Sequence, residues 1–502
     1  MSRKAAHTGI VWFSVFVFIA ITYMSLAYAS PFTRSWDEVD FALALNRYDM
    51  LAMQPHFPGY PYFILGATLV HVWIPDPLKA LSFFNTLMAL SSAIPMTLLV
   101  RRFSDTRKGM LFASLVLTSP LLWLMSAQPM SEAAAIAVLW WYLWSIQVGM
   151  EHPNANFWSL LPLFLFGFLM GVRVSFFPYG LAILLLWVEQ YKRSEAKRIV
   201  KRTRLIIYII LAGCFQLVWV AGLVMSEGNV AGFIKLSLAF LRGHFAEWGG
   251  GVTSSALPFS QRVTQLFIDN LLWNAVLGHS LLIGYLLILL IIAACVGVWQ
   301  VRRRKLGWLI EVEENRRFVM LLVSCTVFYT LWVLFGQNIE KPRHITPIVG
   351  SLLLFVYIAA VRTTLSRLIY PLLIALISTQ LIYGTTLLQR QVRDIPSTYQ
   401  LHEYLSKLEK PFVLYTWEET RILQYLQADY EHKRIFTYDF FQAEAAANSN
   451  RRVLLTNHVL EGFEQQVGSL RNRVRLVAKF NSDTMFDPIY HEILLYEWIG
   501  NN

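Results

Sequence analysis

The 502-residue chain carries little charge for its size and almost no cysteine. Only 15% of its residues are charged and 56% are hydrophobic, whereas about a quarter of the residues of a soluble domain are charged. This composition argues against an ordinary soluble enzyme and is typical of an integral membrane protein. Cys214, Cys295 and Cys325 all fall in apolar segments, so neither a disulfide framework nor metal-ligand spacing is visible.

Two further features are missing from the sequence. The C-terminal region has no Gly-rich phosphate loop, so nucleotide binding is not predicted there. The formal net charge is +11, but the basic residues stand between apolar runs instead of forming one basic face. This placement follows the positive-inside rule of membrane proteins, and no nucleic-acid partner is expected.

Long apolar runs, most of them bounded by basic loops, predict about eleven transmembrane helices. They cover about residues 10–29, 80–100, 110–125, 133–149, 157–171, 175–190, 205–225, 281–299, 318–335, 345–361 and 368–388. Residues 61–73 are apolar but too short to cross, which predicts an interfacial helix. The first run resembles a secretory signal that ends near Ala29, but its length of about 20 residues favours a retained helix.

The basic loops orient the chain in a cell (plasma) membrane with its N-terminus in the cytoplasm. The richest of them covers residues 192–204, and others lie at 302–305 and around Arg362. On the outer side we expect a long loop through residue 278, with a pliable Gly249-Gly250-Gly251 run.

The composition changes after residue 388. Short β-branched and aromatic runs alternate with helical patterns, which predicts a small extracytoplasmic α/β domain over residues 389–502, after a transmembrane domain over 1–388. The expected strands contain residues 413–415, 434–436, 453–455, 474–477 and 493–496.

Acidic residues gather just past the first apolar run, at Asp37, Glu38 and Asp40. The ordinary interpretation is a set of solvated loop charges, but charges close to membrane depth are costly and are commonly kept for function. Glu132 begins the fourth predicted span. It is either a carboxylate favoured by the helix dipole or a second acid that faces the first group across a cavity.

Cationic side chains share the predicted outer face. Arg173 separates two spans, while Lys341, Arg343 and His344 form a compact group before another. Such residues often extend to lipid headgroups, but they are also the donors that a lipid-linked phosphate would need, an arginine above all. His56 lies among prolines and aromatic residues after the acidic group and is a further donor to the same phosphate.

The order of these motifs resembles the polytopic glycosyltransferases of the C superfamily, especially protein O-mannosyltransferases and aminoarabinose transferases. The motifs are an acidic pair after the first span, a Pro-rich aromatic segment, Gln128-Pro129-Met130-Ser131-Glu132, Gly171-x-Arg173 with Pro178, and Arg343-His344-x-x-Pro347. The resemblance covers roughly residues 8–388.

This resemblance implies transfer of a sugar, with inversion, from a polyprenyl-phosphate donor to a lipid, polymer or protein acceptor outside the membrane. Asp37 would be the catalytic base, beside Glu38, which orients the acceptor. Glu132 would be a second acid, and Asp40 leaves the identity of the base open. The donor phosphate would bind mainly Arg343, with Lys341, His344, His56 and Arg173 as further candidates. No cofactor is required, although a divalent cation between Asp37 and Glu132 is an alternative.

Two other functions compete with this interpretation. A transporter or flippase of a lipid-linked glycan would want charges at mid-membrane and broken helices in paired halves, whereas the notable charges here cluster at one face. A non-catalytic scaffold would use the α/β domain to recruit a partner. Replacement of Asp37 by Asn would leave the activity of a scaffold intact.

Overall fold

The computed structural model describes residues 3–246, 252, 257–303, 313–361, 366–409 and 411–500. The chain divides into two compact units. The first contains Met1–Ala29 and Ala44–Gln389, and the second contains Ser30–Leu43 and Arg390–Asn502. The segment Ser30–Leu43, which holds all three early acidic residues, therefore groups with the C-terminal part of the chain.

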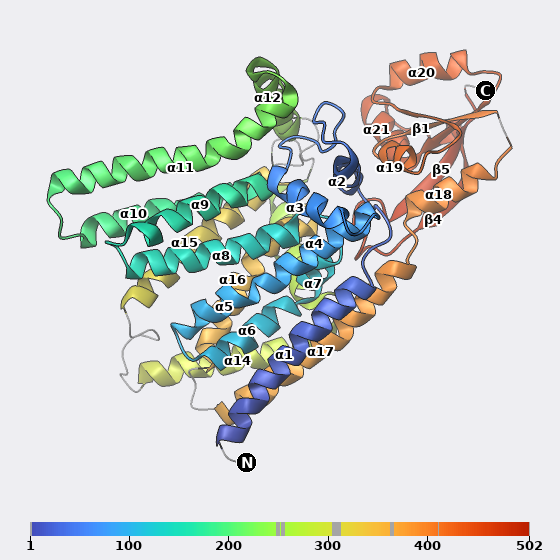
Figure 1. The fold of residues 1–502 in the computed structure, drawn as a ribbon. Coiled ribbons are helices and arrows are strands. Elements are labelled where there is room, and N and C mark those ends of the chain that lie inside the picture. Colours follow the sequence, from blue (N-terminus) through green and yellow to red (C-terminus); the bar gives the residue numbers. More distant parts are fainter. Residues whose placement is uncertain are drawn as a thin grey trace. The chain divides into compact units, whose positions relative to one another are not determined.

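The first unit is helical (Figure 1). Its elements are α1 (Arg3–Ala27), the end of α2 (Trp36–Asn46), α3 (Pro61–His71), α4 (Pro77–Ser91), α5 (Ala93–Arg101), α6 (Thr106–Leu117), α7 (Pro120–Ser126), α8 (Glu132–Glu151), α9 (Asn156–Val172), η1 (Val174–Gly180), α10 (Leu181–Arg193), α11 (Arg198–Glu227), α12 (Val230–Ala246), α13 (Phe259–Thr264), η2 (Gln265–Leu277), α14 (Leu281–Arg303), α15 (Glu313–Gly336), η3 (Pro342–Ile345), α16 (Thr346–Val361) and most of α17 (Ser366–Arg393).

The predicted class of helical membrane protein with a small C-terminal α/β domain is confirmed. Within the described residues, nine helices are long and apolar enough to cross a membrane, and a tenth span results if the bent pair α6 and α7 is counted as one. The predicted span over residues 157–171 corresponds to α9, which has 17 residues and falls below that length. The predicted interfacial segment corresponds to α3, an apolar helix of 11 residues.

The break between α6 and α7 explains why one predicted span is bent. The two helices meet at 77° around Ser119 and Pro120. Proline has no N–H to continue the hydrogen-bond ladder, so it ends one helix and begins the next. Thr118, the last residue before the break, donates to Gln380 Oε1 of α17 at 2.8 Å, which keeps this polar group satisfied in an apolar setting.

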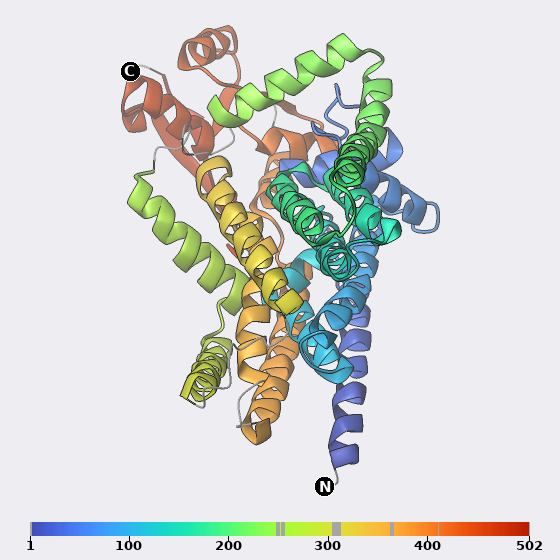
Figure 2. The ribbon, with the colours of Figure 1, turned by 90° about the vertical axis from the view of Figure 1, so that its left-hand side faces the viewer.

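Among the nine continuous spans in the described residues, helix α8 is the most buried, with 83% of an 18-residue stretch inside the protein. It packs against α4, α5, α9 and α10. At the other extreme, only 6% of the corresponding window of α11 is buried, so this helix presents its apolar side chains to the membrane. After α11 the chain turns sharply at Gly228 into α12 (Figure 2), with a positive φ of 83° that glycine adopts without a steric penalty.

The second unit begins with Ser30–Leu43, which includes most of α2, and continues through the end of α17 into a five-stranded mixed sheet. Its further elements are α18 (Ser397–Ser406), β1 (Phe412–Thr416), α19 (Glu419–Tyr425), β2 (Glu431–Arg434), α20 (Tyr438–Ala447), β3 (Arg452–Thr456), α21 (Asn457–Val467), η4 (Arg471–Arg473), β4 (Val474–Asn481) and β5 (Glu492–Trp498). The strand order is β2-β1-β3-β5-β4, with β2, β1 and β3 parallel and the remaining pairs antiparallel.

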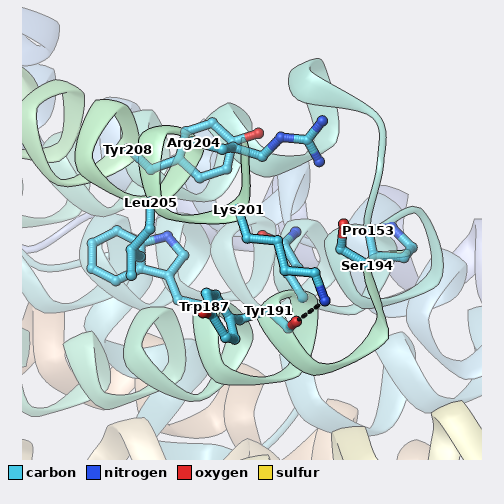
Figure 3. Close-up of a pocket in the computed structure, with 9 residues that line it drawn as sticks. Pro153, Trp187, Tyr191, Ser194, Lys201, Arg204, Leu205 and Tyr208 are labelled. Carbon is cyan, nitrogen blue, oxygen red and sulfur yellow. Dashed lines mark hydrogen bonds between the residues drawn. The ribbon is translucent and has the colours of Figure 1, made fainter. Parts of the chain in front are cut away.

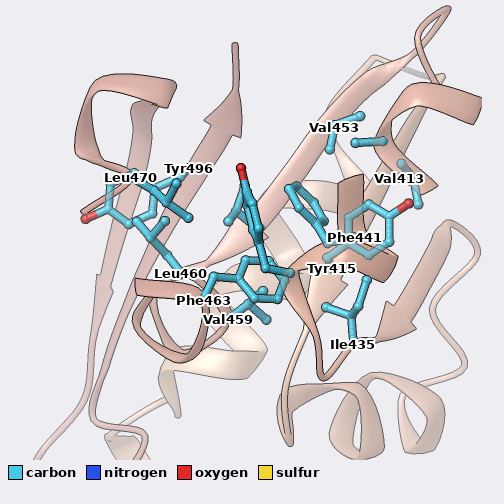
Figure 4. Close-up of a cluster of buried hydrophobic side chains, with 13 residues drawn as sticks. Val413, Tyr415, Ile435, Phe441, Val453, Val459, Leu460, Phe463, Leu470 and Tyr496 are labelled. Atoms are coloured by element: carbon cyan, nitrogen blue, oxygen red, sulfur yellow. The ribbon is translucent and has the colours of Figure 1, made fainter. Parts of the chain in front are cut away.

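Both faces of the central strands are covered. Because successive strand residues point to opposite faces, Val413 and Tyr415 of β1 join Phe441 of α20 and Phe463 of α21 in one core (Figure 4). Phe412 and Leu414 pack in a second core, with helices α18 and α19, on the other face. Truncation of a core aromatic such as Phe441 to Ala would cost about 3–5 kcal/mol.

All five predicted strands exist, and one is displaced. The run 434–436 was expected to be a strand, but β2 is formed by Glu431–Arg434. The displacement has a physical cause, since β2 lies at the edge of the sheet and its four side chains are exposed or half-buried. An edge strand of this kind does not need the apolar pattern that marks a buried one. The predicted basic positions Arg304, Lys305 and Arg362 and the Gly249-Gly250-Gly251 run lie outside the described residues.

Candidate functional site

A buried carboxylate bound by two arginines lies at the start of α8. The side chain of Glu132 is 1% exposed, and its Oε1 lies 2.8 Å from Arg173 Nη2 and 3.0 Å from Arg343 Nε. Arg173 also donates through Nη1 to Ser131 Oγ at 2.7 Å. Three residues that are far apart in the sequence, and that we singled out individually, therefore form one cluster within the first unit. We call Glu132, Arg173 and Arg343 the anchor cluster.

The two arginines of the anchor cluster differ in exposure. Arg173 is buried against Glu132 and Ser131, whereas the Arg343 side chain remains 17% exposed. One carboxylate between two guanidinium groups leaves an excess of one positive charge in an apolar surrounding, where charge is only weakly screened. The cluster can therefore hold an anion through Arg343 while Arg173 fixes the orientation of Glu132.

The turn before Glu132 is held by a residue that the sequence did not single out. Asn85 of α4 is fully buried, and its Nδ2 donates to the backbone oxygens of Gln128 at 2.8 Å and Met130 at 2.6 Å. Its Oδ1 accepts from the Ala134 N–H at 3.2 Å. A polar residue inside a predicted span was the available sequence signal, because such residues are costly in a membrane.

The loop that presents Arg343 is also fixed by buried polar groups. Arg262 of α13 is 0% exposed, and it donates through Nε to the Leu334 oxygen at 2.6 Å. It also donates through Nη2 to the Gln337 oxygen, while Asn270 Nδ2 donates to the Ile339 oxygen at 2.6 Å. These donors satisfy one carbonyl group in the last turn of α15, which a helix terminus otherwise leaves unpaired, and two in the loop after it. They hold the backbone that leads into η3.

Helix η3 carries the other predicted cations. Lys341 precedes it, and Arg343 and His344 lie within it. Tyr329 donates its hydroxyl to the His344 oxygen at 3.0 Å, and Thr346 Oγ1 donates to the Arg343 oxygen at 2.6 Å. The side chains of Lys341 and His344 are half-buried. All three cations are therefore presented by one short, tethered turn.

His56 lies in the aromatic segment after α2. Its Nε2 is 3.2 Å from the Tyr60 hydroxyl, and its ring stacks on Phe240 of α12 with the centroids 6.3 Å apart. Phe57, the next residue, packs against the same Phe240 ring. The predicted Pro-rich segment thus provides an aromatic surface in the first unit, with His56 on it.

The three early acidic residues belong to the second unit and have different surroundings. Asp40 is fully buried, and its Oδ1 accepts a hydrogen bond from Nε of Arg421 in α19 at 2.8 Å and lies 2.8 Å from Nη2 of the same guanidinium group. Glu38 is buried and accepts the Arg34 N–H through Oε2. Asp37 is half-buried. Of the three, Asp37 is therefore the carboxylate with the greatest access to solvent or to a ligand.

The segment that carries these acids is bound tightly within its unit. Arg34 is 3% exposed, lies 2.9 Å from Asp394 Oδ2 and donates to the Gln391 oxygen at 2.9 Å. Trp36 lies beneath the guanidinium groups of Arg434, at 4.8 Å, and of Arg421, at 5.6 Å. Arg421 and Arg434 were not identified from the sequence, because nothing in their local pattern indicates a partner about 380 or 400 positions away.

A second set of buried ionisable groups lies in the α/β domain. His458 Nδ1 is 2.6 Å from Glu419 Oε1. Burial lowers the pKa of His458, but the hydrogen bond to Glu419 and the charges of Glu419, Glu461 and Asp487 together outweigh this effect, so the pKa is raised. Burial raises the pKa of Asp487 to about 6, although the Tyr490 N–H and Arg34 act in the opposite direction. In the described part of the chain, no group of three or more His, Cys, Asp or Glu side chains is arranged to hold a metal ion.

Comparisons with known proteins show which solved structures have a similar fold. No protein-family model and no curated protein matches the chain. Among solved structures it resembles ArnT from Cupriavidus metallidurans bound to undecaprenyl phosphate, with a TM-score of 0.58, 12% identity and coverage of 97% of this chain and 98% of that one. The apo state of the same ArnT gives a TM-score of 0.54, with 12% identity and coverage of 99% and 100%.

A third neighbour is the oligosaccharyltransferase of Archaeoglobus fulgidus in complex with zinc and sulfate. Its TM-score is 0.49 at 13% identity, and the match covers 95% of this chain and 74% of that one. ArnT, an aminoarabinose transferase, belongs to the C superfamily of glycosyltransferases. The resemblance inferred from the order of the motifs is thus confirmed as a likeness of fold, and it extends through the C-terminal α/β domain.

Proposed function

We propose that the protein is a membrane glycosyltransferase that moves a sugar from a polyprenyl-phosphate donor to an acceptor on the outer face of a cell membrane. The observation that carries this proposal is the likeness of fold to ArnT along nearly the whole chain. The ArnT structure that it resembles is bound to undecaprenyl phosphate. The acceptor is a lipid, a polymer or a protein. The anchor cluster supports the proposal independently, because it supplies a fixed, partly exposed arginine for a phosphate.

The proposed reaction is a single displacement. The acceptor hydroxyl gives its proton to the Asp37 carboxylate while its oxygen forms a bond to the anomeric carbon of the sugar. The bond between that carbon and the phosphate oxygen breaks, and its electron pair stays on the phosphate, so polyprenyl phosphate leaves. Attack opposite the leaving group inverts the anomeric configuration, as in inverting glycosidases.

The remaining candidate residues have supporting roles in this proposal. Arg343 stabilises the charge that develops on the departing phosphate, helped by Lys341, His344 and His56. Glu38 orients the acceptor beside Asp37. The direct contacts of the others favour positioning roles: Arg173 orients Glu132, Glu132 fixes Arg343, and Asp40 binds Arg421. Dependence on a divalent cation stays an alternative, and loss of transfer activity in the presence of a chelator would support it.

The experiment has two stages. Mass spectrometry of lipid extracts from a deletion strain should reveal a polyprenyl-phosphate sugar that accumulates when the protein is absent. The purified protein, reconstituted with that extract and a cell-envelope fraction, should then convert the donor to free polyprenyl phosphate. The Asp37→Asn variant should bind the donor without converting it. No accumulated donor, combined with no conversion by the wild-type protein, would contradict the proposal.

The same assay separates the transferase from a flippase. The break between α6 and α7 is a feature also found in transporters, which use discontinuous helices at their binding sites. A flippase would move the labelled donor across a proteoliposome membrane with its sugar–phosphate bond intact. A transferase breaks that bond on one face, so the appearance of polyprenyl phosphate decides between the two functions.

A further inference from the structure

A pocket lies between α10 and α11, remote from the anchor cluster. It is a small hollow with a volume of about 30 Å³, partly open to the outside, so a ligand would place only a few atoms in it and lie over its mouth. Pro153, just beyond the end of α8, contributes to its wall. Glu132 stands at the opposite end of α8, a helix of 20 residues. Such a helix is about 30 Å long, the thickness of the hydrocarbon core, so the pocket and the anchor cluster belong to opposite membrane surfaces.

The wall of the pocket combines cations with aromatic rings (Figure 3). Lys201 and Arg204 come from α11, and Trp187 and Tyr191 come from α10. Lys201 Nζ donates to the Tyr191 backbone oxygen at 3.1 Å and lies 5.5 Å from the centre of the Tyr191 ring, which fixes the ammonium at the pocket. Arg204 forms no ion pair with any residue among those the structure describes. The pocket therefore has an excess of positive charge.

A buried donor in this pocket points to a ligand. The indole Nε1 of Trp187 is inaccessible to solvent and has no hydrogen-bond partner within the described chain. A buried N–H without an acceptor costs about 1–3 kcal/mol, so such groups usually have a partner. The neighbouring polar group is already satisfied: Gln190 donates to the Gly149 oxygen at 3.2 Å and to Ser159 Oγ at 3.0 Å. An acceptor oxygen from a bound molecule would satisfy the indole.

The surroundings of the pocket indicate what that molecule is. Residues 192–204 form the most basic segment of the chain, and α11 continues from it with a nearly unburied apolar surface. Ile206, Ile207, Ile209 and Ile210 are all exposed, immediately after the pocket residues of the same helix. A ligand that fits both features has an anionic head for Lys201 and Arg204 and hydrocarbon chains for α11.

We propose that this pocket binds the headgroup of an anionic glycerophospholipid, at the membrane surface opposite the anchor cluster. Because Lys201, Arg204 and the Trp187 indole point in different directions (Figure 3), they donate to different oxygens of the lipid headgroup, and the acyl chains lie along α11. This site is distinct from that of the polyprenyl-phosphate donor, and its occupancy does not depend on the proposed transferase activity.

Native mass spectrometry of the full chain tests the proposal. Protein exchanged into phosphatidylglycerol should retain at least one lipid, whereas protein in phosphatidylcholine should not. The double variant K201A/R204A should lose this retention at least tenfold, because it removes two charge-assisted donors. Trp187→Phe keeps an apolar aromatic side chain but removes the indole N–H with part of the ring system, so it should weaken retention several-fold and still fold if the double variant does not.

The matched control is the double variant R198A/R202A. It removes the same charge from the same helix, but Arg198 and Arg202 are exposed and do not line the pocket. Retention equal to wild type supports a specific site, while a loss equal to that of K201A/R204A would show diffuse attraction and overturn the proposal. Displacement of the lipid by millimolar inorganic phosphate or glycerol 3-phosphate would also overturn it, because the site would then be for a free anion.

Discussion

Replacement of Arg421 should loosen the segment that carries the proposed base. Asp40 is fully buried, accepts a hydrogen bond from Arg421 Nε at 2.8 Å and forms an ion pair with Arg421 Nη2 at 2.8 Å. At this separation and an effective dielectric constant near 20, the charges attract by about 6 kcal/mol before the cost of desolvation. Removal of one partner of a buried pair costs about 3–5 kcal/mol, because the other charge is left buried and unpaired. Arg421→Met should have a cost in this range.

The matched control is an exposed pair in the same unit. Glu403 of α18 and Lys407, the residue after that helix, lie 2.7 Å apart, but their side chains are 65% and 73% exposed. Solvent screens this pair, so Lys407→Met should leave the stability almost unchanged. Arg421 also lies over Trp36, and loss of that contact adds a smaller cost of about 0.5–1 kcal/mol.

Hydrogen exchange with mass spectrometry measures the effect, because it resolves Ser30–Leu43 from the rest of the second unit. Arg421→Met should speed the exchange of this segment by two orders of magnitude or more, while Lys407→Met leaves it unchanged. The double variant Asp40→Leu with Arg421→Met should recover most of the protection, since both charges are gone. Equal effects of the two single variants, or a double variant as unprotected as Arg421→Met, would refute the reasoning.

Four other outcomes are expected. Asp37→Asn should lower transfer by a factor of about 10²–10⁴, the usual contribution of a general base, with donor affinity near wild type; retained turnover would move the base to Glu38. Arg343→Ala should weaken donor binding at least tenfold, and Arg343→Lys should restore only part of it because lysine lacks the fork; unchanged affinity would remove Arg343 from the phosphate site. A reporter fused after residue 388 should be found outside the cytoplasm, and a cytoplasmic signal would contradict the predicted number and orientation of the spans. Burial raises the pKa of Asp487 from its ordinary 3.8 to about 6, so its contribution to stability, about 3 kcal/mol in all, is present below pH 4 and is lost as the pH rises through 6. Asp487→Asn should therefore raise the unfolding temperature at pH 8 and not at pH 4. An equal shift at both pH values would contradict this.

The architecture was readable from the sequence because its signals are local. A transmembrane helix needs about 20 apolar residues whatever surrounds it, so composition and the positions of lysine and arginine are sufficient to place most spans. The buried strands β1, β3 and β5 were equally visible, since a strand covered on both faces is a continuous apolar run. The edge strand β2 was displaced because its residues, Glu431–Arg434, are all polar, whereas the apolar residues Ile435 and Phe436 come directly after the strand.

The candidate residues were recognised individually, but their partners were decided by tertiary packing. Nothing local to Glu132 shows that its carboxylate binds both Arg173 and Arg343, which follow 41 and 211 positions later. The supporting groups Asn85 and Arg262 were missed for the same reason, because their importance lies in the distant backbone carbonyls that they satisfy.

The early acidic residues Asp37, Glu38 and Asp40 show most clearly which properties follow from the sequence alone and which from the tertiary structure. By itself the sequence determined that three carboxylates follow the first membrane helix, since that depends only on order along the chain. Only the tertiary structure gives them different surroundings. Asp40 forms an ion pair with Arg421, Glu38 accepts a hydrogen bond from the Arg34 backbone N–H, and Asp37 is partly exposed. The reason is physical, because a carboxylate's role depends on its burial and its partner, and both are set by residues hundreds of positions away.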